Sequence, residues 1–328
     1  MQLFYREVIL TLSLGLHAIG APDDEVRSFT RSSDNKSIEA HVVSYDGKQV
    51  VLAVQGKKNY TFDSAIFTED DQQYFQKWVY TSKGMPAPNE LDPRIKPSAT
   101  FRVEMPNLAQ TYTNKPAGFT ISLPPNYSYP EATPLLVFLN GGTGSESLKQ
   151  AKTIAGSMGY ILVSLPYTSE IDKDGPLGNS EKNMELIEAY HSVMLERLRK
   201  LVPNLSQTHR VIVGSSNGAH IIGSAIAMDW DCYLDYFNAF ALWEGGGSIS
   251  RNFKAARGKE YQVWVGWGEK SEFKDFTIGV AEAMDESRVN VTQQAVKTAG
   301  HGLNKEATLL IKEWLKKIAE PHMQGIGS

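Results

Sequence analysis

Residues 210–222, RVIVGSSNGAHII, place a G-x-S-x-G motif between an apolar strand and a helix of small residues. In this context the motif predicts a nucleophile elbow, a tight turn that lifts the hydroxyl of its central serine, Ser216, above the edge of a sheet. Gly214 and Gly218 flank this serine because side chains at those positions would collide where strand and helix meet. Ser215 is the variable residue before Ser216 in the motif, and its side chain is expected to point away from the site. The pattern indicates a serine nucleophile within an α/β domain.

The composition is that of a folded globular protein and excludes several classes of function. Of 328 residues, 41% are hydrophobic and 21% are charged, and the net charge of −4 favours neither a nucleic-acid partner nor a polybasic membrane contact. Cys232 is the single cysteine, which excludes an internal disulfide and a multi-cysteine metal site, and it is expected to be packed rather than reactive. The chain shows no metal-ligand cluster, phosphate loop or dinucleotide fingerprint, so we expect no metal and no cofactor.

Four segments of different character divide the sequence. Residues 1–21 include an apolar run from Val8 to Leu16 and predict a signal peptide, hence a secreted or periplasmic protein without a membrane span, because a span needs about 20 apolar residues. Residues 26–80 predict a small all-β module whose closing helix begins at Thr68. Residues 81–98 contain four prolines and predict a linker. From residue 99 to 320 strands alternate with helices, which predicts a mostly parallel, doubly wound sheet.

Within residues 99–320 the apolar runs predict individual elements. An antiparallel pair is expected at 100–105 and 117–123, and a central buried strand at 134–139. His301, in a Gly-His-Gly loop between the last predicted strand and the last helix, is positioned as a general base for Ser216. Tyr167, Trp243 and Trp267 are either aromatic walls of the site or core residues.

This second segment resembles the α/β-hydrolase superfamily, of the secreted esterase and polyester-depolymerase type. The resemblance rests on the Pro124-Pro125-Asn126-Tyr127 segment, the strand and turn at 135–142, the Ser216 elbow and the His301 loop. It implies an α/β-hydrolase fold and an oxyanion hole made by the backbone amide of Gly142 or Thr143 together with that of Asn217. Asn140 stands where relatives often carry histidine, and it is expected to orient this turn.

The third member of a catalytic triad is less clear from the sequence. The family usually places an aspartate shortly after the next-to-last strand, but the expected position holds Ser271. Glu244, which follows the preceding strand, and Glu269 are equally good alternatives, with Glu272 and then Asp275 behind them. If none of them serves, Ser216 and His301 would form a dyad with poor control of the imidazole tautomer.

The N-terminal module resembles the Sla homology domain, an SH3-like small barrel. The resemblance rests on the segments 27–30, 37–40, 46–48 and 56–57 and on the closing stretch from Glu69 to Trp78. It implies a binding or spacing role, with a peptide or a surface polymer as the ligand.

Together these features predict a serine-dependent carboxylic-ester hydrolase that acts through an acyl-enzyme. No apolar helical lid is visible, which favours a small-molecule or polymeric ester, such as a carbohydrate-linked ester, over a long lipid. Two alternatives remain, namely a serine peptidase of the same fold and a noncatalytic binding protein on a hydrolase scaffold.

Overall fold

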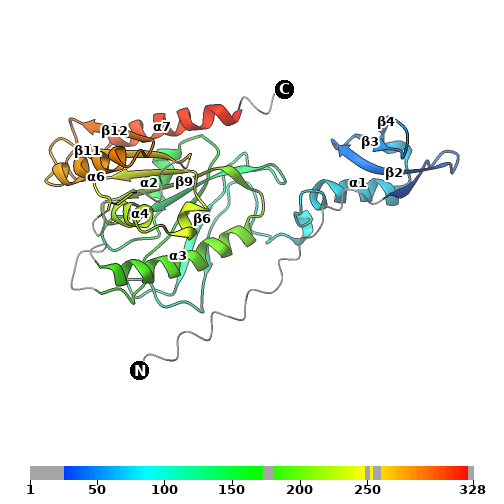
Figure 1. The fold of residues 1–328 in the computed structure, drawn as a ribbon. Coiled ribbons are helices and arrows are strands. Elements are labelled where there is room, and N and C mark those ends of the chain that lie inside the picture. Colours follow the sequence, from blue (N-terminus) through cyan, green and yellow to red (C-terminus); the bar gives the residue numbers. More distant parts are fainter. Residues whose placement is uncertain (1–25, 173–179, 248–251, 254–259, 324–328) are drawn as a thin grey trace. The chain divides into compact units, whose positions relative to one another are not determined.

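The computed structural model describes residues 26–172, 180–247, 252–253 and 260–323 (Figure 1). The chain forms two compact units, one ending at Leu91 and the other beginning at Asp92. This division falls within the predicted linker, residues 81–98. The predicted signal peptide, residues 1–21, lies outside the described residues, and the domain bounds 26–80 and 99–320 stay predictions.

The first unit is an antiparallel sheet in which each strand pairs with the next one along the chain. Its elements are β1 (Arg27–Thr30), β2 (Ser37–Tyr45), β3 (Gln49–Ala53), β4 (Asn59–Asp63), the 3-10 turns η2 (Ser64–Ile66) and η3 (Pro88–Glu90), and α1 (Glu69–Thr81). Phe29, Phe67 and Phe75 form its centre, with ring centroids 5.1 to 6.3 Å apart. Such a cluster supplies a small unit with much of its buried apolar area.

Helix α1 begins where the sequence predicts, at the cap residue Thr68. The Thr68 hydroxyl accepts the Asp71 N–H at 3.4 Å and donates to the Asp71 carboxylate at 2.8 Å. That buried carboxylate also accepts the Thr30 N–H at 2.8 Å and pairs with Arg27 at 3.3 Å. Asp71 therefore ties the helix to strand β1. The sheet agrees with a small all-β module, whereas the relation to Sla homology domains and the ligand of this unit stay predictions.

The second unit contains an eight-stranded sheet in the order β12-β11-β10-β9-β7-β8-β6-β5. Its strands are β5 (Thr100–Glu104), β6 (Gly118–Ser122), β7 (Thr133–Leu139), β8 (Ile161–Ser164), β9 (Leu205–Ser215), β10 (Ala239–Trp243), β11 (Gln262–Gly268) and β12 (Val291–Val296). Strands β7 to β12 run parallel, and β5 and β6 form the antiparallel pair expected at the start of the domain. The predicted central strand is confirmed, because Leu135 to Leu139 of β7 are all fully buried.

Helices cover both faces of this sheet (Figure 1). They are α2 (Lys149–Ala155), α3 (Glu181–Leu201), α4 (Asn217–Ala227), α5 (Asp231–Leu234), α6 (Lys274–Glu286) and α7 (Lys305–Met323). Side chains of α2 and α7 pack with Leu136 and Phe138 on one face, and those of α3, α4, α5 and α6 pack with Leu135 and Val137 on the other. Because strands β9 to β12 are parallel neighbours, the segments that follow them meet at one edge of the sheet.

Candidate active site

Ser216 stands at a sharp turn between β9 and α4. Its backbone has φ 54° and ψ −120°, a sparsely populated conformation that costs on the order of 1–3 kcal/mol and is held only by its surroundings. A side chain at Gly214 would collide with the backbone of Gly218, and one at Gly218 would collide with the carbonyl of Leu139. The Ser216 N–H donates to the carbonyl of Trp243 at 2.9 Å. These contacts confirm the elbow geometry and explain why glycine is needed at both flanks.

His301 lies in the loop between β12 and α7, and its ring faces the serine. The distance from His301 Nε2 to Ser216 Oγ is 3.0 Å, which is within hydrogen-bond reach. The carbonyl of His301 accepts a hydrogen bond from Trp243 Nε1 at 3.2 Å, and its ring packs on Phe273 with centroids 4.6 Å apart. A contact from the end of β10 therefore holds the backbone of His301, and a contact from the N-cap residue of α6 holds its ring.

Glu244 lies directly after β10, and it supplies the partner of the other ring nitrogen. Its Oε2 is 3.3 Å from His301 Nδ1, and its side chain is fully buried. A carboxylate accepts only, so His301 Nδ1 carries the proton and Nε2 is free to accept the Ser216 hydroxyl proton. Glu244 has a φ of 54°, a left-handed conformation that is rare for a residue with a long side chain. Ser216, His301 and Glu244 thus form one hydrogen-bonded series.

Donors on both of its oxygens hold the buried Glu244 carboxylate. The Gly268 N–H donates to Oε1, and the Ser271 hydroxyl donates to Oε2. A buried carboxylate needs such partners, because an unpaired buried charge is strongly unfavourable. From the sequence, Ser271 was noted only because it stands where an aspartate is expected. The sequence did not predict that its hydroxyl would bind Glu244.

Of the two glutamates left as alternatives for the triad acid, Glu244 is the one that contacts His301. Glu269 is exposed and pairs with Lys274, a bond that holds the pKa of its carboxyl below the ordinary value. The Glu269 N–H continues the β11–β12 pairing by donating to Val296 at 3.0 Å. Glu272 and Asp275 are exposed as well. In the described part of the chain none of these three carboxylates forms a hydrogen bond with His301.

The turn after β7 lies against the nucleophile. A Cβ added to Gly141 would come 3.1 Å from Cβ of Ser216, so this turn approaches the serine as closely as a glycine allows. The Asn140 side chain holds the turn by donating to the carbonyls of Ser145 and Ser147 at 2.7 and 3.1 Å. The role expected for Asn140, orienting the turn, agrees with these contacts.

The three residues predicted to form an oxyanion hole lie around this turn and the start of α4. The Asn217 side chain donates to the Gly142 carbonyl at 2.9 Å and so links the two segments. The N–H groups of Gly142, Thr143 and Asn217 donate to no acceptor among the described residues. Asn217 is also the first residue of α4, where the helix dipole favours negative charge. Free amides and a helix N-terminus at this edge suit a developing anion.

The aromatic residues considered as walls of the site belong to the core beneath it. Tyr167, Trp243 and Trp267 are 0%, 1% and 8% exposed. Tyr167 donates its hydroxyl to the Asn140 carbonyl, so it supports the turn after β7 from below. His220, one turn along α4, shares a hydrogen bond of 3.1 Å with the Gly246 carbonyl, and burial lowers its pKa. Burial also raises the pKa of the Cys232 thiol to about 12, as expected for a packed cysteine.

Another histidine of this unit, His191, lies in the interior on α3. It is fully buried, and its Nε2 donates to the Pro166 carbonyl at 2.9 Å. Its Nδ1 therefore accepts from the Tyr233 hydroxyl, at 2.7 Å. Burial lowers the pKa of His191 to about 4. The ring is held neutral, and both of its nitrogens are occupied by uncharged partners.

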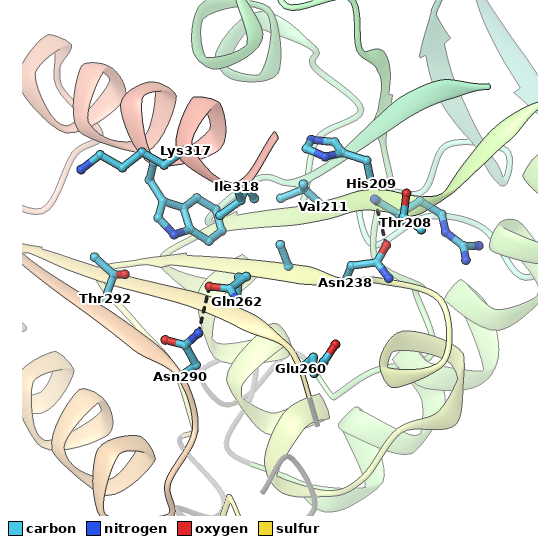
Figure 2. A pocket seen from close by; sticks show the side chains of 13 residues that line it. Thr208, His209, Val211, Asn238, Glu260, Gln262, Asn290, Thr292, Lys317 and Ile318 are labelled. Atoms are coloured by element: carbon cyan, nitrogen blue, oxygen red, sulfur yellow. Dashed lines mark hydrogen bonds between the residues drawn. The ribbon is translucent and has the colours of Figure 1, made fainter. Parts of the chain in front are cut away.

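A cavity of about 740 Å³ opens at the opposite edge of the sheet (Figure 2). It is lined by residues at the amino ends of β9 to β12 and at the end of α7, including Asn238, Gln262 and Asn290. The Asn290 amide donates to Gln262 at 3.0 Å, and both residues line the cavity. Since parallel strands carry the Ser216 site at their carboxyl ends, this cavity is separate from that site.

The described residues contain no cluster of three or more His, Cys, Asp or Glu side chains able to hold a metal ion. Among the helices described, none is both long and apolar enough to cross a bilayer.

Comparison with known proteins identifies the fold. No protein-family model and no curated protein matches the chain. Among solved structures it is similar to an esterase from Rhizomucor miehei, with a TM-score of 0.51 and 15% identity over 73% of this chain and 93% of that one. A carboxylesterase from Mesorhizobium loti gives a TM-score of 0.50 and 18% identity, over 66% of this chain and 98% of the other. Esterase B from Lactobacillus rhamnosis gives 0.51 and 13%, over 71% and 90%. At these identities the likeness shows the α/β-hydrolase fold, which confirms the predicted fold class.

Proposed function

We propose that this protein is a serine-dependent carboxylic-ester hydrolase that works through an acyl-Ser216 intermediate. The observation that carries the proposal is the continuous series from Glu244 through His301 to Ser216, with separations of 3.3 and 3.0 Å. A nucleophile, a base and a group that orients the base are the parts that acyl transfer requires.

In the acylation step, Ser216 Oγ attacks the carbonyl carbon of the ester while its proton passes to His301 Nε2. The carbonyl oxygen becomes an oxyanion, which the amides of Gly142 or Thr143 and of Asn217 receive; one such donor is worth about 10²–10³ in rate. The bond between the carbonyl carbon and the alcohol oxygen then breaks as His301 gives its proton to the leaving alcohol. Glu244 keeps Nδ1 protonated throughout and stabilises the imidazolium that forms.

In the deacylation step, water takes the place of the alcohol. His301 accepts a proton from the water, whose oxygen attacks the acyl carbon, and the proton then returns to Ser216 Oγ as the carboxylic acid leaves. The enzyme is regenerated without a cofactor or a metal. The Glu244 carboxylate is already fixed in place by its hydrogen bonds, so it needs no reorganisation during the reaction.

The substrate class is proposed by analogy and is the coarsest part of the assignment. We propose small or polymeric esters, with acetyl or feruloyl groups on carbohydrate as the first natural candidates. We also propose an exported protein whose first unit binds a peptide or a surface polymer. Cell fractionation and N-terminal sequencing of the mature protein test the export.

The proposal is tested by labelling purified protein with a fluorophosphonate beside the Ser216→Ala variant. Hydrolysis of nitrophenyl butyrate is assayed in parallel, a short acyl chain chosen because esterase B is described with a tributyrin phosphonate inhibitor. Labelling and turnover that both vanish in the variant are expected. A folded wild-type protein that neither labels nor turns over would contradict the proposal and favour the noncatalytic alternative. Turnover of peptides but not of esters would favour the peptidase.

A further inference from the structure

Ser271 occupies the place where the resemblance to α/β-hydrolases leads one to expect the acidic member of the triad. The residue follows β11, whereas the glutamate that contacts His301 follows β10, the neighbouring strand. The serine hydroxyl nevertheless reaches the site, because it donates to Oε2 of Glu244, the oxygen that also faces His301 Nδ1. One carboxylate oxygen therefore joins position 271 to the imidazole.

The backbone around Ser271 is arranged to hold its hydroxyl in this direction. The Ser271 N–H donates to the Gly268 carbonyl at 3.0 Å, and its Oγ accepts the Phe273 N–H at 3.1 Å. Because Oγ is occupied as an acceptor, its own proton is directed toward the carboxylate. The same turn contributes the Gly268 N–H to Oε1. Both oxygens of Glu244 are thus held by one short segment between β11 and α6.

Glu244 needs such a segment more than an aspartate after β11 would. Its side chain has one more methylene, and so one more rotatable bond to restrain. Its backbone is in a left-handed conformation at φ 54°, so the side chain leaves the strand in an unusual direction. A carboxylate that is free to turn would lose the 3.3 Å contact with His301 Nδ1 and with it control of the tautomer.

We infer that Ser271 is a positioning residue of the site, which fixes the carboxylate of Glu244 against His301 in place of the acid that position 271 would otherwise supply. This inference rests on the proposed function. It makes Ser271 a partner of the acid, although the serine touches neither substrate nor reacting atoms.

The first test compares Ser271→Ala with the conservative Ser271→Thr. Removing the hydroxyl is expected to lower kcat for nitrophenyl butyrate about tenfold with little change in KM, the cost of one hydrogen bond to a charged group. The threonine variant keeps a hydroxyl and is expected to stay within about threefold of wild type. Glu272→Gln, a change at the exposed neighbouring residue, serves as the matched control and is expected to leave kcat unchanged.

The second test moves the carboxylate from position 244 to position 271. Glu244→Gln is expected to lower kcat about 10⁴-fold, because the amide favours the wrong tautomer. Adding Ser271→Asp to that variant puts a carboxylate where the hydroxyl now contacts position 244, and we expect it to recover at least tenfold. No recovery, together with an unchanged kcat in Ser271→Ala, would overturn the inference.

A readout that needs no turnover separates this inference from the proposed function. The proton between Glu244 and His301 Nδ1 is expected to give a downfield NMR signal, which should broaden or shift in Ser271→Ala and persist in Ser271→Thr. If wild-type protein fails to react with the fluorophosphonate while the signal behaves in this way, the hydrolase proposal fails and the positioning role stands. If the signal is the same in Ser271→Ala and in wild type, the positioning role fails.

Discussion

His301 and His191 make the same kind of contacts in two regions of the second unit. Each ring has a hydrogen-bond partner on both nitrogens. The partners of His191 are a phenol and a backbone carbonyl, and the ring is completely buried on α3. Those of His301 are a buried carboxylate and a serine hydroxyl, and its side chain is 39% exposed at the carboxyl edge of the sheet.

The difference between these two regions indicates which features would separate the base of the proposed mechanism from a structural histidine. Burial among neutral groups lowers the pKa of His191 below the physiological range, so its ring does not take up a second proton there. In the proposed mechanism, the carboxylate on one side of His301 stabilises the imidazolium that forms when the ring takes the proton of the serine hydroxyl on its other side. The two rings have the same number of hydrogen-bond partners. They differ in the charge of one partner and in exposure to solvent, and these are the properties that we expect to matter for proton transfer.

The largest expected effect tests this contrast by removing each ring in turn. His301→Gln is expected to lower kcat for nitrophenyl butyrate about 10⁶-fold, because an amide cannot act as a base, while leaving the unfolding transition nearly unchanged. His191→Gln is the matched control, and it is expected to keep its kcat at a temperature where the variant is folded. Steady-state kinetics with circular dichroism measure both. If the His301 variant keeps more than about 1% of the wild-type kcat, His301 does not act as the base and the proposed difference between His301 and His191 fails.

The next effect concerns stability and acts on His191. Its folded pKa of about 4 lies below the ordinary 6.5, so between these values the unfolded chain binds a proton that the folded protein does not. Stability from this group is complete above about pH 6.5 and is lost as the pH falls toward 4, in total about 3 kcal/mol of unfolding free energy. Denaturant unfolding at pH 7.5, 6 and 4.5 measures it.

The comparison for this pH series is His191→Gln, whose amide can still donate to Pro166. Its unfolding free energy is expected to fall less steeply with acid than that of wild type, since other titrating groups contribute equally to both chains. Parallel pH curves for the two proteins would show that His191 is not held neutral by the fold.

The smallest expected effect sharpens the contrast between the two glutamates. Glu269→Gln removes only an exposed ion pair with Lys274, which is screened by solvent, and we expect kcat to change less than about twofold. Measured beside Glu244→Gln, it gives a matched pair of changes in the same chemical group. A loss at Glu269 comparable to that at Glu244 would assign the acid role to the surface residue instead.

Much of this arrangement could be predicted from local sequence. The elbow at Ser216 and the loop of His301 are specified by glycines and by the strand and helix that flank them. The buried strand β7 is a continuous apolar run, and α1 begins at a capping threonine. These features depend on neighbours within a few residues, which a single sequence displays.

The acid could not be chosen in the same way, because the contacts that distinguish Glu244 from Glu269 join separate strands. Glu244 and Ser271 are 27 residues apart and meet only when β10 and β11 pair. One hint was visible in the sequence: position 271 holds a serine, where the family pattern has an aspartate. That a hydroxyl there would support a carboxylate from the next strand follows from the sheet order and not from the sequence pattern.

The sheet order has a consequence for how the proposed catalytic site forms during folding. Ser216 and His301 are separated by 85 residues, and Glu244 and His301 by 57. The hydrogen bonds between them exist only after β9, β10, β11 and β12 have aligned side by side, a set of long-range pairings that form slowly in folding chains. If Ser216 is the nucleophile we propose, its reactivity toward a fluorophosphonate during refolding would therefore report when these four strands have paired, because the serine lacks its hydrogen-bonded partners until then.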